Sequence, residues 1–353
     1  MKNSIYTFSL ILVVFLLGCS NDDAPAPTEQ FTDAESYFSD INFQGSVLIK
    51  KNGNTILNRS YGEANLGQNE SNTPETKFRI GSVTKTFTAM AMVQLKRDGL
   101  IESFDQKLSE FDDEFPEGDK ISIRHLLSHG SGLPDYVDAI EPIAKSGTYV
   151  SPEDILDAIM ETVEEDGLLF EPGSAVSYSN SNFLIAALLI DELTDEGYEE
   201  YIRLNVLEPL NMNDTELGEN EITESGYAHG YEGSEDVSSY PMPVAYGAGD
   251  WTSTTADLAR WAEAVMGDWF TAEERNDVFP GDVPAGYTMF GLGWFKSNLA
   301  NKDFYWHGGD ISGFTALMGF EPTTGGIVIA LSNQGDKGDQ RFEIIETLLA
   351  HQF

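Results

Sequence analysis

Hydrophobic residues near both ends of the chain occur in short runs that are rich in β-branched and aromatic side chains. Residues 45–51 and 55–61 flank Asn52-Gly53, a dipeptide typical of a tight hairpin turn, so we expect two antiparallel strands there. A helix at about residues 340–349 is expected to close the chain. Similar runs toward the C-terminus predict further strands at residues 291–294, 315–320 and 326–332.

The middle of the chain carries the longer hydrophobic segments that are typical of helices. One of these begins at Ser82, is apolar on nearly every side, and runs to about Leu95, with a stop expected at Gly99. Because it has no polar face, this helix is expected to run through a core. Residues 151–215 and 255–266 are also expected to be mainly helical.

These elements predict an α/β (α+β) fold with one antiparallel sheet. Both ends of the chain are expected to contribute strands to that sheet, which helices flank. We expect a sheet lobe from residues 31–80 and 285–353, and a mostly helical lobe from residues 81–284. Together they would form one structured unit over residues 31–353.

Charge excludes one class of function. The 353 residues include 20 Lys and Arg but 59 Asp and Glu, a formal net charge of −39. Such a surface repels nucleic acids, so we exclude DNA and RNA as partners. The simplest interpretation of the charge is solubility, and we expect a monomer.

The N-terminus has the pattern of a targeting segment. Residues 5–17 form an apolar run that is too short to span a membrane comfortably and follows the positive charge of Lys2. The run ends in Leu-Leu-Gly-Cys19, which resembles the lipobox of bacterial lipoproteins. This resemblance implies that residues 1–18 are a signal peptide, that Cys19 is lipidated, and that residues 19–30 form a disordered tether. The alternative is a plain secretory signal with an incidental cysteine.

A lipidated Cys19 would attach the protein to a membrane of the bacterial cell envelope, either at the outer membrane or in the periplasm. Cys19 is the only cysteine in the sequence, so no internal disulfide can form.

Ser82 and Lys85 are the first candidates for chemistry. Their spacing at a helix start places both side chains on one face. A serine hydroxyl needs an adjacent base to become a good nucleophile, and a lysine can serve if burial lowers its pKa. The free N–H groups of a helix start also favour an oxyanion. The alternative is an ordinary capped helix.

Two further polar motifs accompany this pair. Tyr178-Ser179-Asn180 precedes an apolar run, and Tyr178 can exchange a proton if a nearby cation lowers its pKa. The alternative is a helix cap beside a packed tyrosine. His307-Gly308-Gly309-Asp310 follows an aromatic strand, and its glycines would let a substrate approach the backbone closely. The alternative there is a simple turn.

The three motifs together resemble those of the serine β-lactamase and penicillin-binding family, in the branch with class C β-lactamases, D,D-peptidases and related esterases. That family has Ser-x-x-Lys, Tyr-x-Asn and Lys-Thr-Gly or His-x-Gly in this order. The segments 78–81, 121–133, 171–173, 254–260 and 290–294 also resemble it, and the likeness spans about residues 35–350.

The resemblance implies a β-lactamase/transpeptidase-like fold and acyl transfer without a cofactor. Ser82 would attack a carbonyl, Lys85 would take part in proton removal, and Tyr178 would act as general base and later activate water. Asn180 would orient Lys85 or the substrate amide. The backbone N–H groups of Ser82 and Asp310 would form an oxyanion hole, beside His307, Gly308 and Gly309.

The sequence departs from the family pattern at His307. β-Lactamases and D,D-peptidases usually have a lysine here, a permanent cation that helps to hold a substrate carboxylate. A histidine is only partly charged near pH 7. Histidine here resembles the esterase and D-amino-acid amidase members, so we expect weak β-lactam hydrolysis and better cleavage of a small ester, a D-amino-acid amide or a short peptide.

Other interpretations are weaker. His125 and His129 are four residues apart, as zinc ligands on a helix can be, but no third ligand accompanies them, so we expect no metal. Ser131 lies between glycines but outside any Gly-x-Ser-x-Gly motif. Trp251, Trp294 and Trp306 are expected to be core aromatics rather than a ligand stack, although one of them could line a cleft. The non-enzymatic alternative is a surface lipoprotein that binds peptidoglycan-type peptides, although a pure binder does not need all four polar residues.

Overall fold

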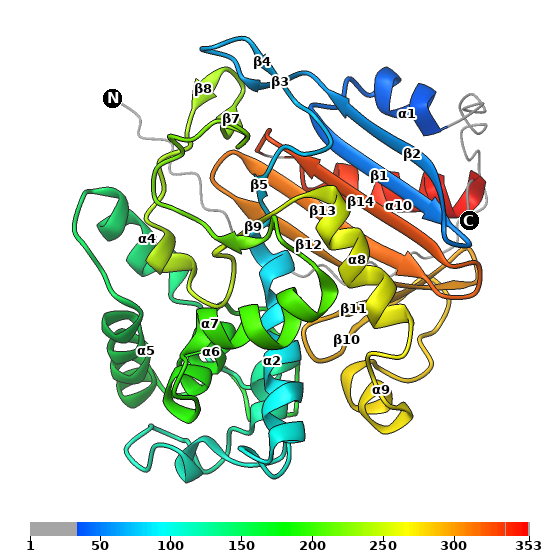
Figure 1. Cartoon of the computed structure of the whole chain (residues 1–353). Coiled ribbons are helices and arrows are strands. Elements are labelled where there is room, and N and C mark those ends of the chain that lie inside the picture. Colours follow the sequence, from blue (N-terminus) through cyan, green and yellow to red (C-terminus); the bar gives the residue numbers. More distant parts are fainter. Residues whose placement is uncertain (1–33, 336, 352–353) are drawn as a thin grey trace, which may run out of the picture.

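The computed structural model describes residues 34–335 and 337–351 (Figure 1). Residues 1–33 lie outside the described part, and with them the predicted signal peptide, tether and lipidated Cys19. No helix among the described residues has the length and apolar character needed to cross a membrane.

A seven-stranded antiparallel sheet forms one lobe (Figure 1). Its strand order is β10-β11-β12-β13-β14-β1-β2, so the N-terminal hairpin pairs with the C-terminal strands. This confirms the predicted sheet from both ends of the chain. The strands are β1 (Gly45–Lys51), β2 (Asn54–Tyr61), β10 (Thr288–Phe290), β11 (Phe295–Leu299), β12 (Lys302–Ile311), β13 (Phe314–Glu321) and β14 (Gly326–Ser332).

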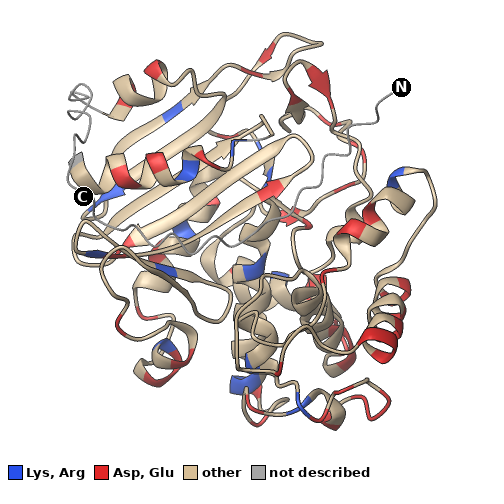
Figure 2. Cartoon of the chain, turned by 180° about the vertical axis from the view of Figure 1, so that it is seen from behind, with Lys and Arg blue, Asp and Glu red and all other residues tan. Residues whose placement is uncertain are grey.

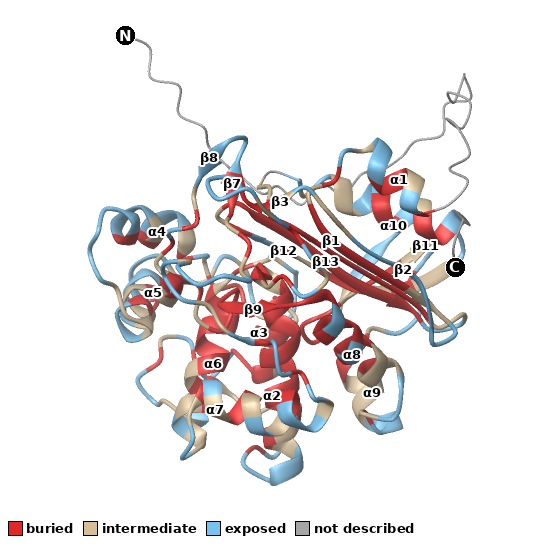
Figure 3. Ribbon diagram, turned by 45° about the horizontal axis from the view of Figure 1, so that its top comes forward, coloured by how far each residue is buried: buried red, intermediate tan, exposed pale blue. Residues whose placement is uncertain are grey.

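Alternating side chains bury both faces of the sheet. In β1, Val47 and Ile49 join a core beneath α1 and α10, while Leu48 joins the larger core on the opposite face. The strands β1, β13 and β14 are therefore buried at most positions, and Figure 3 shows buried residues along the sheet and the central helices. The helices are α1 (Ala34–Asp40), α2 (Thr84–Asp98), α3 (Ile123–Leu127), α4 (Val137–Lys145), α5 (Pro152–Asp166), α6 (Ser181–Leu193), α7 (Tyr198–Ile202), α8 (Thr255–Met266), α9 (Ala272–Val278) and α10 (Gln340–His351).

The helical lobe is built around α2 and α6, which pack against each other. Helix α2 is buried on most sides, as its apolar sequence predicts, and Gly99 ends it in a left-handed conformation. Helix α8 lies within residues 81–284 but packs on the sheet, against β14, β1 and β13. Short two- and three-residue strands, β3 (Glu63–Asn65), β4 (Glu70–Ser71), β5 (Phe78–Arg79), β6 (Glu216–Leu217), β7 (Tyr231–Glu232), β8 (Glu235–Asp236) and β9 (Trp251–Ser253), complete the structure.

The predicted strand at residues 291–294 is wrong, because this segment is the turn between β10 and β11. Gly293 has φ of +73°, and its N–H donates to the carbonyl of Leu127 rather than to a neighbouring strand. A Cβ at Gly291 would lie 2.1 Å from the carbonyl oxygen of Val278. The glycines therefore serve close packing here.

Acidic residues are spread over the helices and loops of both lobes, while the strands of the sheet carry few of them (Figure 2).

Candidate active site

Ser82 lies in a short 3₁₀ turn, Gly81–Val83, directly before α2. The sequence predicted Ser82 at a helix start, and the α-helix itself begins two residues later at Thr84. Gly81 has φ of +50°, and a Cβ there would lie 2.8 Å from the backbone nitrogen of Asp310. Glycine therefore allows the turn that carries Ser82 to pack directly against β12.

Lys85 lies one turn further along and is completely buried. Its Nζ atom is 3.0 Å from Ser82 Oγ, 2.8 Å from Asn180 Oδ1 and 2.7 Å from the carbonyl oxygen of Ala248. Burial lowers the pKa of Lys85 to about 7, even though the carboxylates of Asp135 and Asp250 act in the opposite direction. Near neutral pH, a large share of Lys85 is therefore unprotonated and able to accept a proton.

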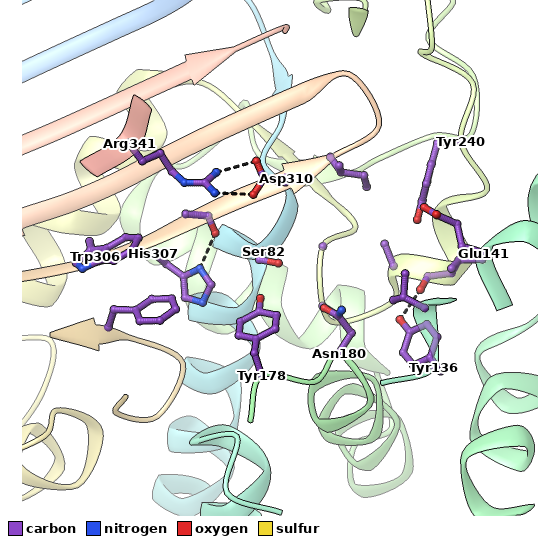
Figure 4. Close-up of a pocket in the computed structure, with 18 of the residues that line it drawn as sticks. Ser82, Tyr136, Glu141, Tyr178, Asn180, Tyr240, Trp306, His307, Asp310 and Arg341 are labelled. Atoms are coloured by element: carbon purple, nitrogen blue, oxygen red, sulfur yellow. Dashed lines mark hydrogen bonds and ion pairs between the residues drawn. The ribbon is translucent and has the colours of Figure 1, made fainter. Parts of the chain in front are cut away.

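Tyr178 points its hydroxyl toward Ser82 from the loop before α6 (Figure 4) and makes a hydrogen-bond contact with it. Its ring stacks on His129 with 4.3 Å between centroids. Burial raises the pKa of Tyr178, and the nearby carboxylates of Asp135 and Asp310 raise it further. The cation of Arg341 acts in the opposite direction, but burial outweighs it, so the net shift is upward and Tyr178 is a protonated donor at neutral pH.

Asn180 joins Lys85 to a carboxylate that sequence reasoning missed. Its Oδ1 accepts from Lys85, and its Nδ2 donates to Asp135 Oδ2 at 2.9 Å. Because the two partners need opposite ends of the amide, they fix its orientation. Asp135 also accepts from the backbone N–H of Asn180. Asp135 directly follows the glycine-rich loop of residues 129–134, and only this position in the sequence could have drawn attention to it.

His307 lies within β12, so the alternative of a simple turn is wrong. The ring is buried, and its Nδ1 donates to the carbonyl of Gly308 at 2.6 Å. Burial, together with the charge of Lys85, lowers the pKa of His307 to about 3. The partial charge that the sequence suggested is therefore absent near pH 7, and His307 is a neutral side chain.

Gly309 allows β12 to pack closely against the turn that carries Ser82. A Cβ at Gly309 would lie 1.9 Å from the carbonyl oxygen of Ile80 and 3.0 Å from the backbone nitrogen of Ser82. No other residue fits between these backbones. The backbone of Asp310 is consequently held beside Gly81 and Ser82, where two N–H groups could face one oxyanion.

A cleft of about 330 Å³ between the two lobes (Figure 4) is lined by Ser82, Tyr178, Asn180, His307, Gly308 and Asp310. Trp306 lines the cleft, whereas Trp251 and Trp294 are core residues, as the sequence predicted for the tryptophans in general. Sequence reasoning also missed several other residues that line the cleft: Tyr136, Glu141, Tyr240 and Arg341.

His125 and His129 serve the structure. His129 Nδ1 accepts from the backbone N–H of Ser179, which fixes the ring that supports Tyr178. Within residues 34–335 and 337–351, no three His, Cys, Asp or Glu side chains are grouped so that they could hold a metal ion. Ser131 is buried and donates to Asn182 Oδ1.

The geometry of the site agrees with the family resemblance seen in the sequence. A comparison with known protein families establishes which family the chain belongs to. The Beta-lactamase family model matches residues 43–352. The chain belongs to the β-lactamase family. Its predicted fold class is confirmed by solved structures of this family.

Among relatives, the chain is 28% identical over 303 residues to the protein PbpX of Bacillus subtilis, which covers 84% of this chain and 72% of PbpX. The chain spans between 59% and 72% of the length of the curated relatives that it matches. The family and the solved structures support a serine hydrolase.

Two solved structures are similar over most of the chain. A penicillin-binding protein from Bacillus halodurans superposes with a TM-score of 0.77 at 25% identity, covering 89% of this chain and 98% of that one. The D-amino acid amidase from Ochrobactrum anthropi SV3, in complex with D-phenylalanine, gives a TM-score of 0.74 at 25% identity, covering 86% and 92%.

Proposed function

We propose that the protein hydrolyses D-amino-acid amides, short D-amino-acid peptides or small esters through an acyl-enzyme on Ser82. One observation carries this proposal. Ser82 and the buried Lys85, whose pKa is lowered, come from one helix start and meet the protonated Tyr178 of a second, distant segment beside one cleft. Each supplies a group that acyl transfer needs.

Acylation begins when unprotonated Lys85 takes the hydroxyl proton of Ser82 across 3.0 Å. The Ser82 oxygen then adds to the substrate carbonyl carbon. The carbonyl oxygen gains a negative charge, and the backbone N–H groups of Ser82 and Asp310 stabilise it. Removing one such contact in other enzymes costs about 10²–10³ in rate.

The leaving group departs with the hydroxyl proton of Tyr178. The raised pKa keeps that proton on the phenol until the bond to the leaving group breaks. The proton held by Lys85 then passes to the tyrosine, which restores the phenol. In the second half, water adds to the acyl carbon and gives a proton to Lys85. Tyr178 gives its hydroxyl proton to Ser82 Oγ as the ester bond breaks, and the proton on Lys85 then restores the phenol.

The charges of the cleft support the choice of substrate. His307 is neutral, so it cannot attract a carboxylate as a lysine would. Glu141 lines the cleft and is hydrogen-bonded to Tyr240, and its side chain is 30% exposed. It also forms an exposed ion pair with Lys145 at 3.3 Å, which contributes little by itself. A carboxylate at this place suits the ammonium group of a D-amino-acid amide. The D-amino acid amidase of similar fold supports the same substrate class.

A covalent probe tests the acyl-enzyme. A fluorescent fluorophosphonate should label the wild type, and Ser82→Ala should abolish the label. Ser131→Ala is a matched control because this serine is buried and does not line the cleft. Labelling that persists in Ser82→Ala would refute Ser82 as the nucleophile. No labelling of either protein would favour the peptide-binding lipoprotein.

Substrate preference needs a direct comparison. We expect D-alanine p-nitroanilide and p-nitrophenyl esters to be cleaved faster than nitrocefin, with L-alanine p-nitroanilide as the stereochemical control. Nitrocefin turnover as fast as that of a dedicated β-lactamase would contradict the proposed preference.

We also propose that Cys19 carries a lipid anchor in the bacterial cell envelope. The supporting observation is the apolar run that ends at this cysteine. Radiolabelled palmitate should enter the wild type but not Cys19→Ala, and the variant should then be released from membranes.

A further inference from the structure

Arg341 is the only lysine or arginine among the described residues that line the cleft. It comes from the start of α10 and reaches over β12. A Cβ at Gly308 would lie 2.7 Å from Arg341 Nε, so the missing side chain of Gly308 makes room for the guanidinium. The Arg341 side chain is 15% exposed, which places a mostly desolvated cation at the edge of the cleft.

The carboxylate of Asp310 forms an ion pair with the Arg341 guanidinium. Its Oδ1 accepts from Arg341 Nη1 at 2.8 Å, and its Oδ2 accepts from Nη2 at 2.6 Å (Figure 4). The same Nη1 also donates to the carbonyl of Gly309. This two-point contact is the geometry in which an arginine binds a free carboxylate. The part of the guanidinium that could hold a substrate carboxylate is therefore already bound.

Both charges act on the reaction centre. The charge of Asp310 raises the pKa of Tyr178, whereas that of Arg341 lowers it, so both lie close enough to affect the phenol. With His307 neutral and Arg341 paired, the net charge of the cleft lining comes from Glu141. A substrate carboxylate near the scissile bond would meet Asp310 as a like charge.

We propose that the carboxylate of Asp310 stands in for a substrate carboxylate and makes the cleft select against acidic acyl donors. This inference rests on the proposed acyl hydrolase and adds a specificity-determining residue to it. Asp310 then has two separate roles. Its backbone N–H faces the oxyanion, and its side-chain carboxylate disfavours the binding of anionic substrates. In the ion pair with Arg341, the Asp310 carboxylate repels substrates that carry a carboxylate of their own.

Matched substrates test the proposal on both sides of the scissile bond. One pair is an N-acylglycyl thiolactate and its methyl ester, which differ by a carboxylate in the leaving group. The other is mono-p-nitrophenyl succinate and its methyl ester, which differ in the acyl group. The quantity measured is the ratio of kcat/KM for the anionic member to that for the neutral member.

Asp310→Asn keeps the backbone N–H and the side-chain shape but removes the charge. It should raise the ratio about tenfold to a hundredfold in at least one pair, the range expected for freeing a hydrogen-bonding charge. Arg341→Gln in the same chain should remove that gain. Asp113→Asn, the same charge change at an exposed position outside the cleft lining, should leave the ratio unchanged.

The proposal is overturned if Asp310→Asn leaves both ratios unchanged, or if the gain survives Arg341→Gln. Binding in the Ser82→Ala background provides a readout without catalysis. Calorimetry there should show tighter binding of the anionic member after Asp310→Asn. If the protein were never acylated, the proposed hydrolase would fail, yet this binding difference would still decide the role of Asp310.

Discussion

The Nζ atom of Lys85 lies 3.0 Å from Ser82 Oγ, and the lysine side chain has no contact with solvent. These two facts are linked, because the burial that positions the amine also lowers its pKa to about 7. A lysine in water, with a pKa near 10.4, would be protonated at neutral pH and could not accept the serine proton.

The first prediction concerns pH. Since Lys85 must be unprotonated, kcat/KM for a neutral ester should rise about tenfold per pH unit below pH 7 and level off above it. His307, with a pKa of about 3, should add no further step between pH 5 and 9. Lys85→Met should lower kcat/KM by about 10²–10⁴. A flat profile in the wild type would contradict this role.

Lys85→Arg is the matched control for that prediction. Arginine retains a positive charge but stays protonated at any accessible pH. It should therefore be as inactive as Lys85→Met, and recovery of activity would mean that charge alone is required.

The second prediction separates a proton donor from a general base. Tyr178→Phe should slow cleavage of D-alanine p-nitroanilide by about 10²–10⁴, because an amide leaving group needs a proton. It should slow acylation by a p-nitrophenyl ester less than tenfold, because nitrophenolate leaves unprotonated. Pre-steady-state rates of acylation would measure both. Equal losses with both substrates would favour the general-base role that the family resemblance implied.

The third prediction concerns substrate binding. Glu141→Gln should raise KM for D-alanine p-nitroanilide about tenfold with little change in kcat, because an ammonium partner is lost. N-acetyl-D-alanine p-nitroanilide, which lacks that charge, serves as the control substrate and should be unaffected. A parallel change with both substrates would show that Glu141 acts on the structure of α4 instead.

The fourth prediction compares two adjacent glycines. Gly309→Ala would place a Cβ 1.9 Å from a backbone oxygen of Ile80, so β12 must move away from the Ser82 turn. We expect a loss of at least about 10² in kcat/KM and a lower melting temperature. Gly308→Ala meets only the flexible side chain of Arg341 and should keep most activity on neutral esters. Comparable damage from both changes would contradict the steric argument.

Strong local patterns made most of the fold predictable. The hairpin at Asn52-Gly53, the all-round apolar α2 and its stop at Gly99 each have a local physical cause, and the structure contains all three. The segment 291–294 could not be read in this way. Its glycines serve contacts with residues that are distant in sequence, such as Leu127 and Val278, and no local pattern reveals such contacts.

The same distinction applies to the candidate site. Ser82, Lys85, Tyr178, Asn180 and His307 could be found because they belong to motifs with fixed spacing. Their ionisation could not, since it depends on burial that only the folded chain creates. Asp135, Glu141 and Arg341 belong to no motif. Asp135 reaches Asn180 from the loop before α4, and Glu141 and Arg341 reach the cleft through the packing of α4 and α10.

Strand β1 pairs with β14, so that Gly45 lies opposite Ser332. The sheet therefore cannot close until the residues up to Ser332 have left the ribosome, and β1 and β2 must wait for β14. Such distant pairing makes assembly slow compared with that of a helical bundle. A chain cut short before β14 would leave β1 and β13 as open edges, which invites self-association rather than a smaller folded unit.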